Sequence, residues 1–432
     1  MDRTYLCIDM KTFYASVECA CRGLNPFETN LVVADLTRGK NALCLAVTPK
    51  LKAQGVRNRC RISEIPPSIS YIAAPPRMQL YIDYAADIYA LYLDYFDPRD
   101  IHVYSIDESF IDVTGYLKTY QTDARALAKR LMNDIASHLH IPATAGVGSN
   151  LFLAKIALDI TAKHAKDHIG FLSEELFRQT MWDHRPITDF WQIAAGTANR
   201  LARHGIFTLR GITEADPALL YKIFGVDAEL LIDHAWGRES CRICDIKNYR
   251  GKSRSVSFSQ ILPRDYSAHE ARTVLAEMVL HGCQELMRRK VICGKLWVGI
   301  GYSREAHEMT HGTVRLTSAG NANCVIAPFA LQLYDRLALP EFEVRRLAIS
   351  FSDVCDEGCE GYDFFTDWEK VEREKAKEKT VLELMDRFGK NAVLRGTNLR
   401  KEATQKERNE MIGGHRAGYD DKTGTGKTVS AV

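Results

Sequence analysis

Two sets of acidic residues at the ends of apolar runs are best suited to chemistry in this sequence. Asp9 ends the run 6–8, and Asp107 and Glu108 follow the run 103–106. Both runs read as strands, and a fold that pairs them would gather three carboxylates in one pocket. Carboxylates that close repel unless a divalent cation lies among them, and hard oxygen ligands with open positions suit Mg²⁺ together with substrate phosphates. The pattern predicts two-metal phosphoryl transfer; the alternative is a solvated turn, since acids also end strands by breaking the pairing.

Neighbouring residues on a regular strand face opposite sides of the sheet. Asp107 and Glu108 can therefore reach the same pocket only if one of them leaves the strand. We expect Glu108 to sit in the turn of a short hairpin.

Composition indicates a globular protein of several domains. The 432 residues are 46% hydrophobic, which predicts roughly two to four domains. No apolar run reaches the length of a membrane span and no signal peptide is evident, so we expect a cytoplasmic protein without a membrane partner. The 12 cysteines are scattered, as in a reducing compartment. The spacings Cys241/Cys244 and Cys355/Cys359 lack a second Cys or His pair, which argues against zinc.

The order of predicted elements is βαββαβ, and it occurs twice. The first copy comprises strand 5–9, helix 12–22, strands 101–106 and 110–113, helix 123–139 and strand 143–148. The second comprises strand 253–260, helix 269–289, strands 294–303 and 312–317, helix 327–337 and strand 344–351. This order predicts an α+β fold with antiparallel sheets and helices on one side. The other face of the first sheet would then be free for a substrate.

The two copies of the βαββαβ order differ in their charged residues. Only the first has paired acids at its strand ends, whereas residues 250–352 carry a modest basic excess. Phosphate contacts require such an excess, although an ordinary surface fluctuation explains it equally well. The second sheet thus fits binding rather than catalysis.

Two other segments carry weaker signals. Residues 191–206 predict a helix, a tight glycine turn and a second helix, which would either present backbone N–H groups to a phosphate or form a plain helical hairpin. Residues 368–388 predict a charged amphipathic helix, and we expect disorder from residue 413 onward. The stretch 424–428 is not a phosphate loop, because Asp421 stands where the first glycine is required.

The segment Ser105-Ile106-Asp107-Glu108-Ser109-Phe110-Ile111-Asp112, read together with Asp9, resembles the catalytic motif of the Y-family DNA polymerases. Within that family, the chain is most similar to the bacterial UmuC/ImpB/MucB/SamB-like branch, over residues 1 to about 352. The resemblance implies that Asp9, Asp107 and Glu108 hold two Mg²⁺ ions, with the backbone carbonyl of Met10 as a further ligand.

The resemblance also implies a nucleotide pocket. Tyr14, beside Phe13, matches the family's steric gate against a ribose 2′-hydroxyl; the alternative is a core aromatic at helical spacing. Lys52 and Lys163 match the triphosphate-binding positions, Lys163 with a one-residue offset, although either could be a solvated helix-face residue. Pro49 replaces a tyrosine of the archaeal-type pattern, and Lys52 replaces an arginine with its fork geometry.

In the thumb, Gln192-Ile193-Ala194 replaces the family's Gly-Ile-Gly start, which puts its backbone contact with the primer in doubt. Residues 253–353 correspond to the little finger, where Arg254, Lys295 and Arg304 are the candidates for DNA phosphate contacts. In the tail, Tyr362, Phe364 and Phe365 weakly resemble a clamp-binding pentapeptide; a buried strand is the alternative.

The resemblance implies a right-hand architecture with six parts. These are the palm, 1–25 and 78–165; the fingers, 26–77; the thumb, 166–240; a linker, 241–252; the little finger, 253–353; and a tail, 354–432, helical and then disordered.

The leading interpretation is a DNA-dependent DNA polymerase that carries out error-prone translesion synthesis in an SOS-type response. Its implied partners are primer-template DNA, deoxynucleoside triphosphates, a sliding clamp and SOS accessory proteins. Pro49, Lys52 and the altered thumb turn motivate a second reading, a DNA-binding accessory protein without useful activity. A nucleotidyl cyclase could share the βαββαβ palm with metal-binding acids, but the basic second sheet and the Phe13-Tyr14 pair argue against it.

Overall fold

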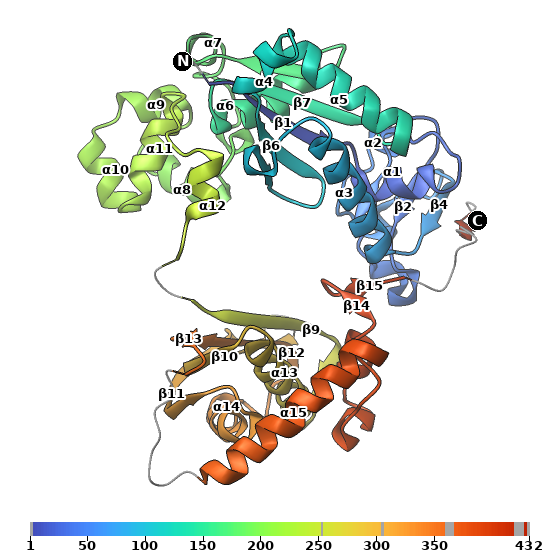
Figure 1. The fold of residues 1–432 in the computed structure, drawn as a ribbon, viewed down its shortest axis with the longest axis vertical. Coiled ribbons are helices and arrows are strands. Elements are labelled where there is room, and N and C mark those ends of the chain that lie inside the picture. The colour runs from blue at the N-terminus through green and yellow to red at the C-terminus, as the bar shows by residue number, and fades with distance from the viewer. Residues whose placement is uncertain (1–2, 252–253, 304–305, 359–366, 419–426, 430–432) are drawn as a thin grey trace. The chain divides into compact units, whose positions relative to one another are not determined.

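The computed structural model describes residues 3–251, 254–303, 306–358, 367–418 and 427–429. The chain forms two compact units (Figure 1). The N-terminal unit comprises Met1–Tyr249 and Ala417–Val432, and the C-terminal unit comprises Arg250–Arg416. The chain therefore leaves the N-terminal unit and returns to it at its end.

The N-terminal unit contains most of the helices and strands. Its strands are β1 (Tyr5–Met10), β2 (Leu31–Val33), β3 (Ala46–Val47), β4 (Tyr71–Ala74), β5 (Ile101–Val103), β6 (Glu108–Asp112), β7 (Ala143–Gly148), β8 (Ile169–Leu172) and β16 (Lys427–Val429). Its helices are α1 (Phe13–Ala20), α2 (Pro49–Ala53), α3 (Met78–Leu93), α4 (Thr114–Thr119), α5 (Ala124–Leu139), α6 (Leu151–Ile156), α7 (Glu174–Thr180), α8 (Ala195–Ala202), α9 (Leu209–Glu214), α10 (Pro217–Phe224), α11 (Asp227–Ala235) and α12 (Ile243–Asn248).

The palm sheet has the strand order β5-β6-β1-β7-β8, with β1 antiparallel to both β6 and β7. Its last pair, β7 and β8, is parallel. Helix α5 packs on β7 and β1, and helix α3, which the sequence pattern did not predict, packs on α5. The other face is not free as expected, because α6 and α12 cover part of it and bury Cys7 and Phe110.

Glycines on β7 let α6 lie directly on the sheet. A Cβ atom at Gly146 would lie 2.1 Å from the carbonyl oxygen of Ala154, and one at Gly148 would lie 2.2 Å from the Ala154 nitrogen. No side chain tolerates such an approach to backbone atoms, so the helix can pack this closely only on glycine.

We expect Gly146→Ala to destabilise the protein by at least about 2 kcal/mol, because the atoms it meets belong to backbone and cannot rotate away. Urea unfolding followed by circular dichroism measures this. Gly115→Ala is the matched control, since a Cβ there meets no atom within 4 Å and alanine favours the helix by up to about 1 kcal/mol. Equal stability of Gly146→Ala and wild type would contradict the close packing.

The segment predicted as fingers contributes a small second sheet with the order β16-β4-β2-β3. Its core includes Val32, Cys44, Val47 and Leu51. The strand β16 pairs antiparallel with β4, so this part of the tail is not disordered as predicted. The edge of β4 presents unpaired backbone groups, and a polar strand can satisfy them as well as an apolar one.

The segment predicted as the thumb contains α7 to α11, but it also contains β8, which joins the five-stranded sheet. The prediction of two helices within residues 191–206 was wrong: this range holds one α-helix, α8, which is followed by a turn where Gly205 has a φ of 76° and then by α9 from Leu209. The segment predicted as a linker contains α12 instead, because Ile243 and Ile246 at helical spacing pack beside Tyr5 and Phe110.

The C-terminal unit contains the second βαββαβ arrangement. Its elements are β9 (Val256–Tyr266), α13 (Ala268–Arg288), β10 (Val291–Tyr302), β11 (Thr310–Gly320), α14 (Asn323–Leu337), β12 (Val344–Ser352), β13 (Cys355–Asp356), α15 (Trp368–Phe388), α16 (Gln405–Arg408), β14 (Met411–Ile412) and β15 (His415–Arg416).

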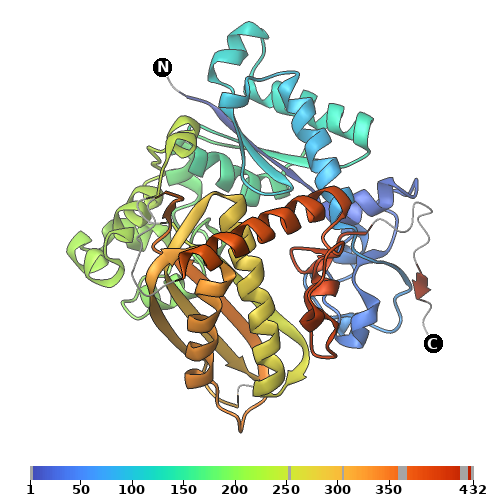
Figure 2. The same cartoon turned by 60° about the horizontal axis from the view of Figure 1, so that its bottom comes forward.

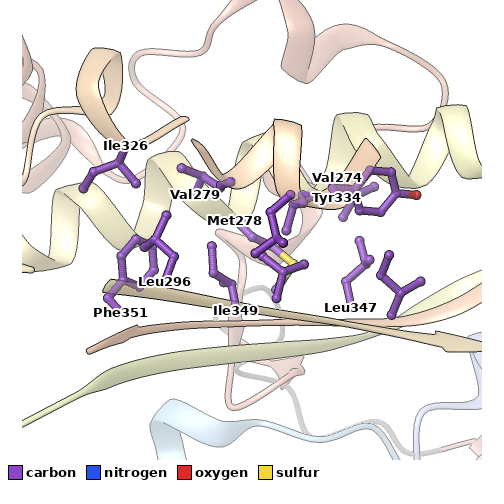
Figure 3. Close-up of a cluster of buried hydrophobic side chains, with 14 of the residues drawn as sticks. Val274, Met278, Val279, Leu296, Ile326, Tyr334, Leu347, Ile349 and Phe351 are labelled. Atoms are coloured by element: carbon purple, nitrogen blue, oxygen red, sulfur yellow. The ribbon is translucent and has the colours of Figure 1, made fainter. Parts of the chain in front are cut away.

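Its main sheet has the antiparallel order β11-β10-β12-β9. Figure 3 shows side chains of α13 and α14, among them Met278, Val279 and Ile326, packed above Ile349 and Phe351 of the sheet. The helices cover one face of this sheet, and the predicted α+β fold class with two βαββαβ sheets is confirmed.

The C-terminal unit extends beyond the predicted little finger and includes α15 and the following segment. Helix α15, orange-red in Figure 2, lies across α13 and α14. The buried carboxylate of Glu277 on α13 accepts hydrogen bonds from the Asn398 side chain at 2.7 Å and from the backbone N–H groups of Thr404 and Gln405 at 2.8 and 3.1 Å. A polar segment is therefore ordered here because a buried acid needs its donors.

Among the described residues, no helix is long and apolar enough to cross a membrane.

Candidate active site

The three predicted carboxylates lie near the end of β1, close enough for the charges of Asp107 and Glu108 to act on Asp9. Asp9 is paired with Glu108, the first residue of β6, so both side chains leave the same face of the sheet. Asp107 precedes β6, and its carbonyl oxygen accepts a hydrogen bond from the Met10 N–H at 2.9 Å. This bond folds the turn back onto β1. The expectation that Glu108 occupies the turn was wrong: Asp107 is the residue that leaves the strand.

The electrostatics of the three acids differ. Burial, followed by the charges of Asp107 and Glu108, raises the pKa of Asp9 to about 8. Asp107 accepts a hydrogen bond from the Ser105 hydroxyl at 2.6 Å. Glu108, only 7% exposed, accepts one from the Lys155 ammonium at 2.8 Å. The high pKa of Asp9 means that its negative charge is poorly compensated by the protein alone.

The donor set fits a hard divalent cation. Carboxylate oxygens from Asp9, Asp107 and Glu108, with the carbonyl of Met10 at the end of β1, are the ligand types that Mg²⁺ prefers. Among the described residues, no three acidic, histidine or cysteine side chains converge closely enough to hold an ion as they stand. Bound cations would therefore have to draw the carboxylates together.

Lys52 lies near Asp9, and Lys163 and a third lysine, Lys11, lie near Lys52. Burial lowers the pKa of Lys52; Asp9 opposes this, and the charges of Lys163 and Lys11 add to it. Lys11 follows Asp9 by two residues, and its ammonium lies 3.3 Å from the His168 ring. The strand pattern does not indicate Lys11, because this residue lies beyond the end of β1. Several cations gathered around one acid form a potential site for a polyanion.

Lys163 lies at an irregular end of a helix. The helix that begins at α6 continues as a π-helical turn, Ala157–Thr161, and then as a 3₁₀ turn, Ala162–His164, that carries Lys163.

Tyr14 and Phe13 begin α1 but differ in exposure. Phe13 is 2% exposed and packs in the core, whereas Tyr14 is only half-buried. Burial and the nearby charge of Asp107 raise the pKa of Tyr14. Its ring stacks on Tyr81 of α3, with centroids 4.6 Å apart.

A buried carboxylate fixes this aromatic pair. Glu18 of α1 is fully buried and accepts hydrogen bonds from the Tyr81 hydroxyl at 2.7 Å and from the Arg77 guanidinium at 2.9 and 2.7 Å. Arg22 also pairs with it. Because α1 and α3 are joined at this point, the ring of Tyr14 has a rigid support.

The predicted DNA contacts fall in the C-terminal unit. Arg254 is exposed and pairs with Asp356 at 3.0 Å. Lys295 lies opposite Arg315 on β10 and β11, on the sheet face away from the helices. Arg304 lies outside the described residues, as do the candidate clamp-binding residues Tyr362, Phe364 and Phe365.

Comparisons with known proteins bear on the fold and on the family of the chain. A chimera of Y-family DNA polymerases, Dbh-Dpo4(243-245)-Dbh, superposes with a TM-score of 0.63 at 21% identity, covering 82% of this chain and 99% of the chimera. The family model described as "impB/mucB/samB family" matches residues 8–159, and its C-terminal domain model matches residues 253–364.

Full-length relatives are also similar. The "Putative UV-damage repair protein UvrX" of Bacillus subtilis (strain 168) is 29% identical over 96% of this chain and 98% of its own length. "DNA polymerase IV 2" of the same organism is 28% identical over 96% and 99%.

The fold is the right-hand fold of the Y-family DNA polymerases. Within that class, the chain belongs to the impB/mucB/samB family.

Proposed function

We propose that this protein is a DNA-directed DNA polymerase that carries out error-prone translesion synthesis by two-metal nucleotidyl transfer. The observation that carries the proposal is the set of three carboxylates at the junction of β1 and β6, with lysines beside it and an aromatic ring at its edge. The printed names of the relatives, a UV-damage repair protein and a DNA polymerase IV, support synthesis on damaged template.

The acidic and the basic residues of the site would have different roles. Asp9, Asp107 and Glu108, with the Met10 carbonyl, would hold two Mg²⁺ ions, which when bound lower the pKa of the primer 3′-hydroxyl and stabilise the leaving pyrophosphate. Lys52, Lys163 and Lys11 would bind the triphosphate as point charges. The ring of Tyr14 would lie against the incoming sugar.

The C-terminal unit would hold the primer-template. Arg254, Lys295 and Arg304 would contact DNA phosphates, with Arg315 added by its place opposite Lys295. Such binding weakens as salt is added, in proportion to the phosphates neutralised. A cytoplasmic location, an SOS-type setting, and contacts of Tyr362, Phe364 and Phe365 with a sliding clamp complete the proposal.

Primer extension tests this function. The purified full chain is given Mg²⁺, four deoxynucleotides and a labelled primer on an undamaged template or on one with a single abasic site. We expect extension on both templates, with insertion opposite the abasic position. Tight DNA binding without extension would favour the accessory-protein reading, and cyclic product from one nucleotide without a primer would favour a cyclase.

A further inference from the structure

A buried lysine outside the predicted ligand set contacts one of the three acids. Lys155 of α6 is 8% exposed, and its ammonium lies 2.8 Å from Oε2 of Glu108 and 3.0 Å from Oδ1 of Asp159. The sequence marks Lys155 only as a helical lysine. Its role follows from its contacts with Glu108 and Asp159.

Both oxygens of Glu108 have a fixed donor. The Cys7 thiol lies 3.1 Å from Oε1, while Lys155 holds Oε2. Among the described residues, neither Asp9 nor Asp107 forms an ion pair with a lysine or arginine. Asp107 has a donor on one oxygen, the Ser105 hydroxyl, whereas Glu108 has a donor on each of its two oxygens. The Glu108 carboxylate is therefore the more restricted in rotation, and two donors still leave lone pairs for another ligand.

Several local features converge to put Lys155 at this place. Gly146 and Gly148 let α6 lie on the sheet. The Asn150 side chain caps the helix by accepting a hydrogen bond from the Leu153 N–H at 2.8 Å. A buried ion pair is weak evidence for stability, because desolvation offsets much of the attraction. The contact of this ion pair with one of the three acids is what points to a role in the site.

We propose that Lys155, assisted by the Cys7 thiol, is the positioning residue for Glu108 and holds its carboxylate in the orientation that binds a divalent cation. This inference rests on the proposed function, since it takes Glu108 as a metal ligand. Side chains that orient a metal ligand typically change metal affinity or activity 10- to 100-fold when they are removed.

A double-mutant cycle on Mn²⁺ binding tests the proposal without requiring activity. Mn²⁺ affinity of the DNA-free full chain is measured by electron paramagnetic resonance for wild type, Lys155→Met, Glu108→Gln and the double variant. We expect Lys155→Met to weaken binding about tenfold when Glu108 is present, and to have less than about a twofold effect beside Glu108→Gln, because it acts only through that carboxylate.

Equal weakening in both backgrounds would overturn the proposal and assign Lys155 a purely structural role. Tighter Mn²⁺ binding by Lys155→Met would also overturn it, since Lys155 would then compete with the cation. If Glu108→Gln leaves too little binding to compare, Lys155→Arg decides: recovered affinity supports positioning by charge, and affinity as low as that of Lys155→Met contradicts it.

Asp159→Asn is the matched control. It removes the other acid of Lys155 and leaves the contact with Glu108, so we expect Mn²⁺ affinity within about twofold of wild type. Primer extension keeps the two proposals apart. A wild type that shows the expected coupling but extends no primer would refute the polymerase and leave the positioning role intact. An active polymerase in which Lys155→Met and Glu108→Gln show no coupling would support the polymerase and refute the positioning role.

Discussion

Asp107→Ala should lower the rate of nucleotide addition at least about a thousand-fold while leaving DNA affinity within about threefold of wild type. Asp107 is the acid that leaves the strand, and its place depends on the bond between its carbonyl oxygen and the Met10 N–H rather than on its carboxylate. Removing the carboxylate therefore removes a metal ligand without unfolding the turn. Several kcal/mol of transition-state stabilisation depend on such a ligand.

Single-turnover primer extension measures the rate, and fluorescence anisotropy with a labelled primer-template measures the DNA affinity. Asp112→Asn is the matched control, because Asp112 lies at the far end of β6, the strand that follows Asp107, and pairs with Arg3 at 3.1 Å, away from Asp9. We expect its rate within about threefold of wild type. Nucleotide addition at an ordinary rate by Asp107→Ala would refute the assignment of the metal site.

Tyr14→Ala should lower the preference for deoxynucleotides over ribonucleotides about 10- to 200-fold, the range expected when one steric contact is lost. The ring of Tyr14 stacks on Tyr81, which is itself tied to Glu18, so the ring cannot swing away from a 2′-hydroxyl. Alanine leaves open space there, and the ratio of kcat/KM values for the two nucleotides reports the change.

Tyr14→Phe separates the ring from its hydroxyl. We expect this variant to keep the discrimination, because the stacked ring and its support by Tyr81 remain. Tyr81→Leu should give an intermediate loss, since it removes the support but leaves the ring. If all three variants discriminate as wild type does, the gate lies elsewhere in the pocket.

The sequence predicted regular elements well where apolar periodicity is strong. The helix predicted at residues 368–388 is α15, Trp368–Phe388, and the second βαββαβ order is present with its boundaries shifted by a few residues. Elements whose apolar spacing is less regular were missed. Helix α3 was absent from the prediction, and α12 was assigned to a linker.

The tail shows a different limit of prediction from sequence, that of composition. Its polar composition predicted disorder from residue 413, yet the hairpin β14–β15 spans Met411–Arg416 and β16 pairs with β4. Composition measures how much apolar surface a segment can bury. It does not show whether the backbone groups of the segment have hydrogen-bond partners elsewhere in the chain. Such partners are an unpaired strand edge or a buried acid such as Glu277.

The sequence by itself determined which acids are the candidates for the site, because Asp9, Asp107 and Glu108 stand at strand ends within a recognisable motif. Only the tertiary structure decided how these acids differ. The register of β1 with β6 places Asp107, not Glu108, in the turn. Packing of α6 on the glycines of β7 gives Glu108 its lysine, whereas burial and the charges of Asp107 and Glu108 raise the pKa of Asp9. The physical reason is that charge compensation depends on which helix lies against which strand. The distance between a lysine on the helix and an acid on the strand is therefore not encoded by local sequence.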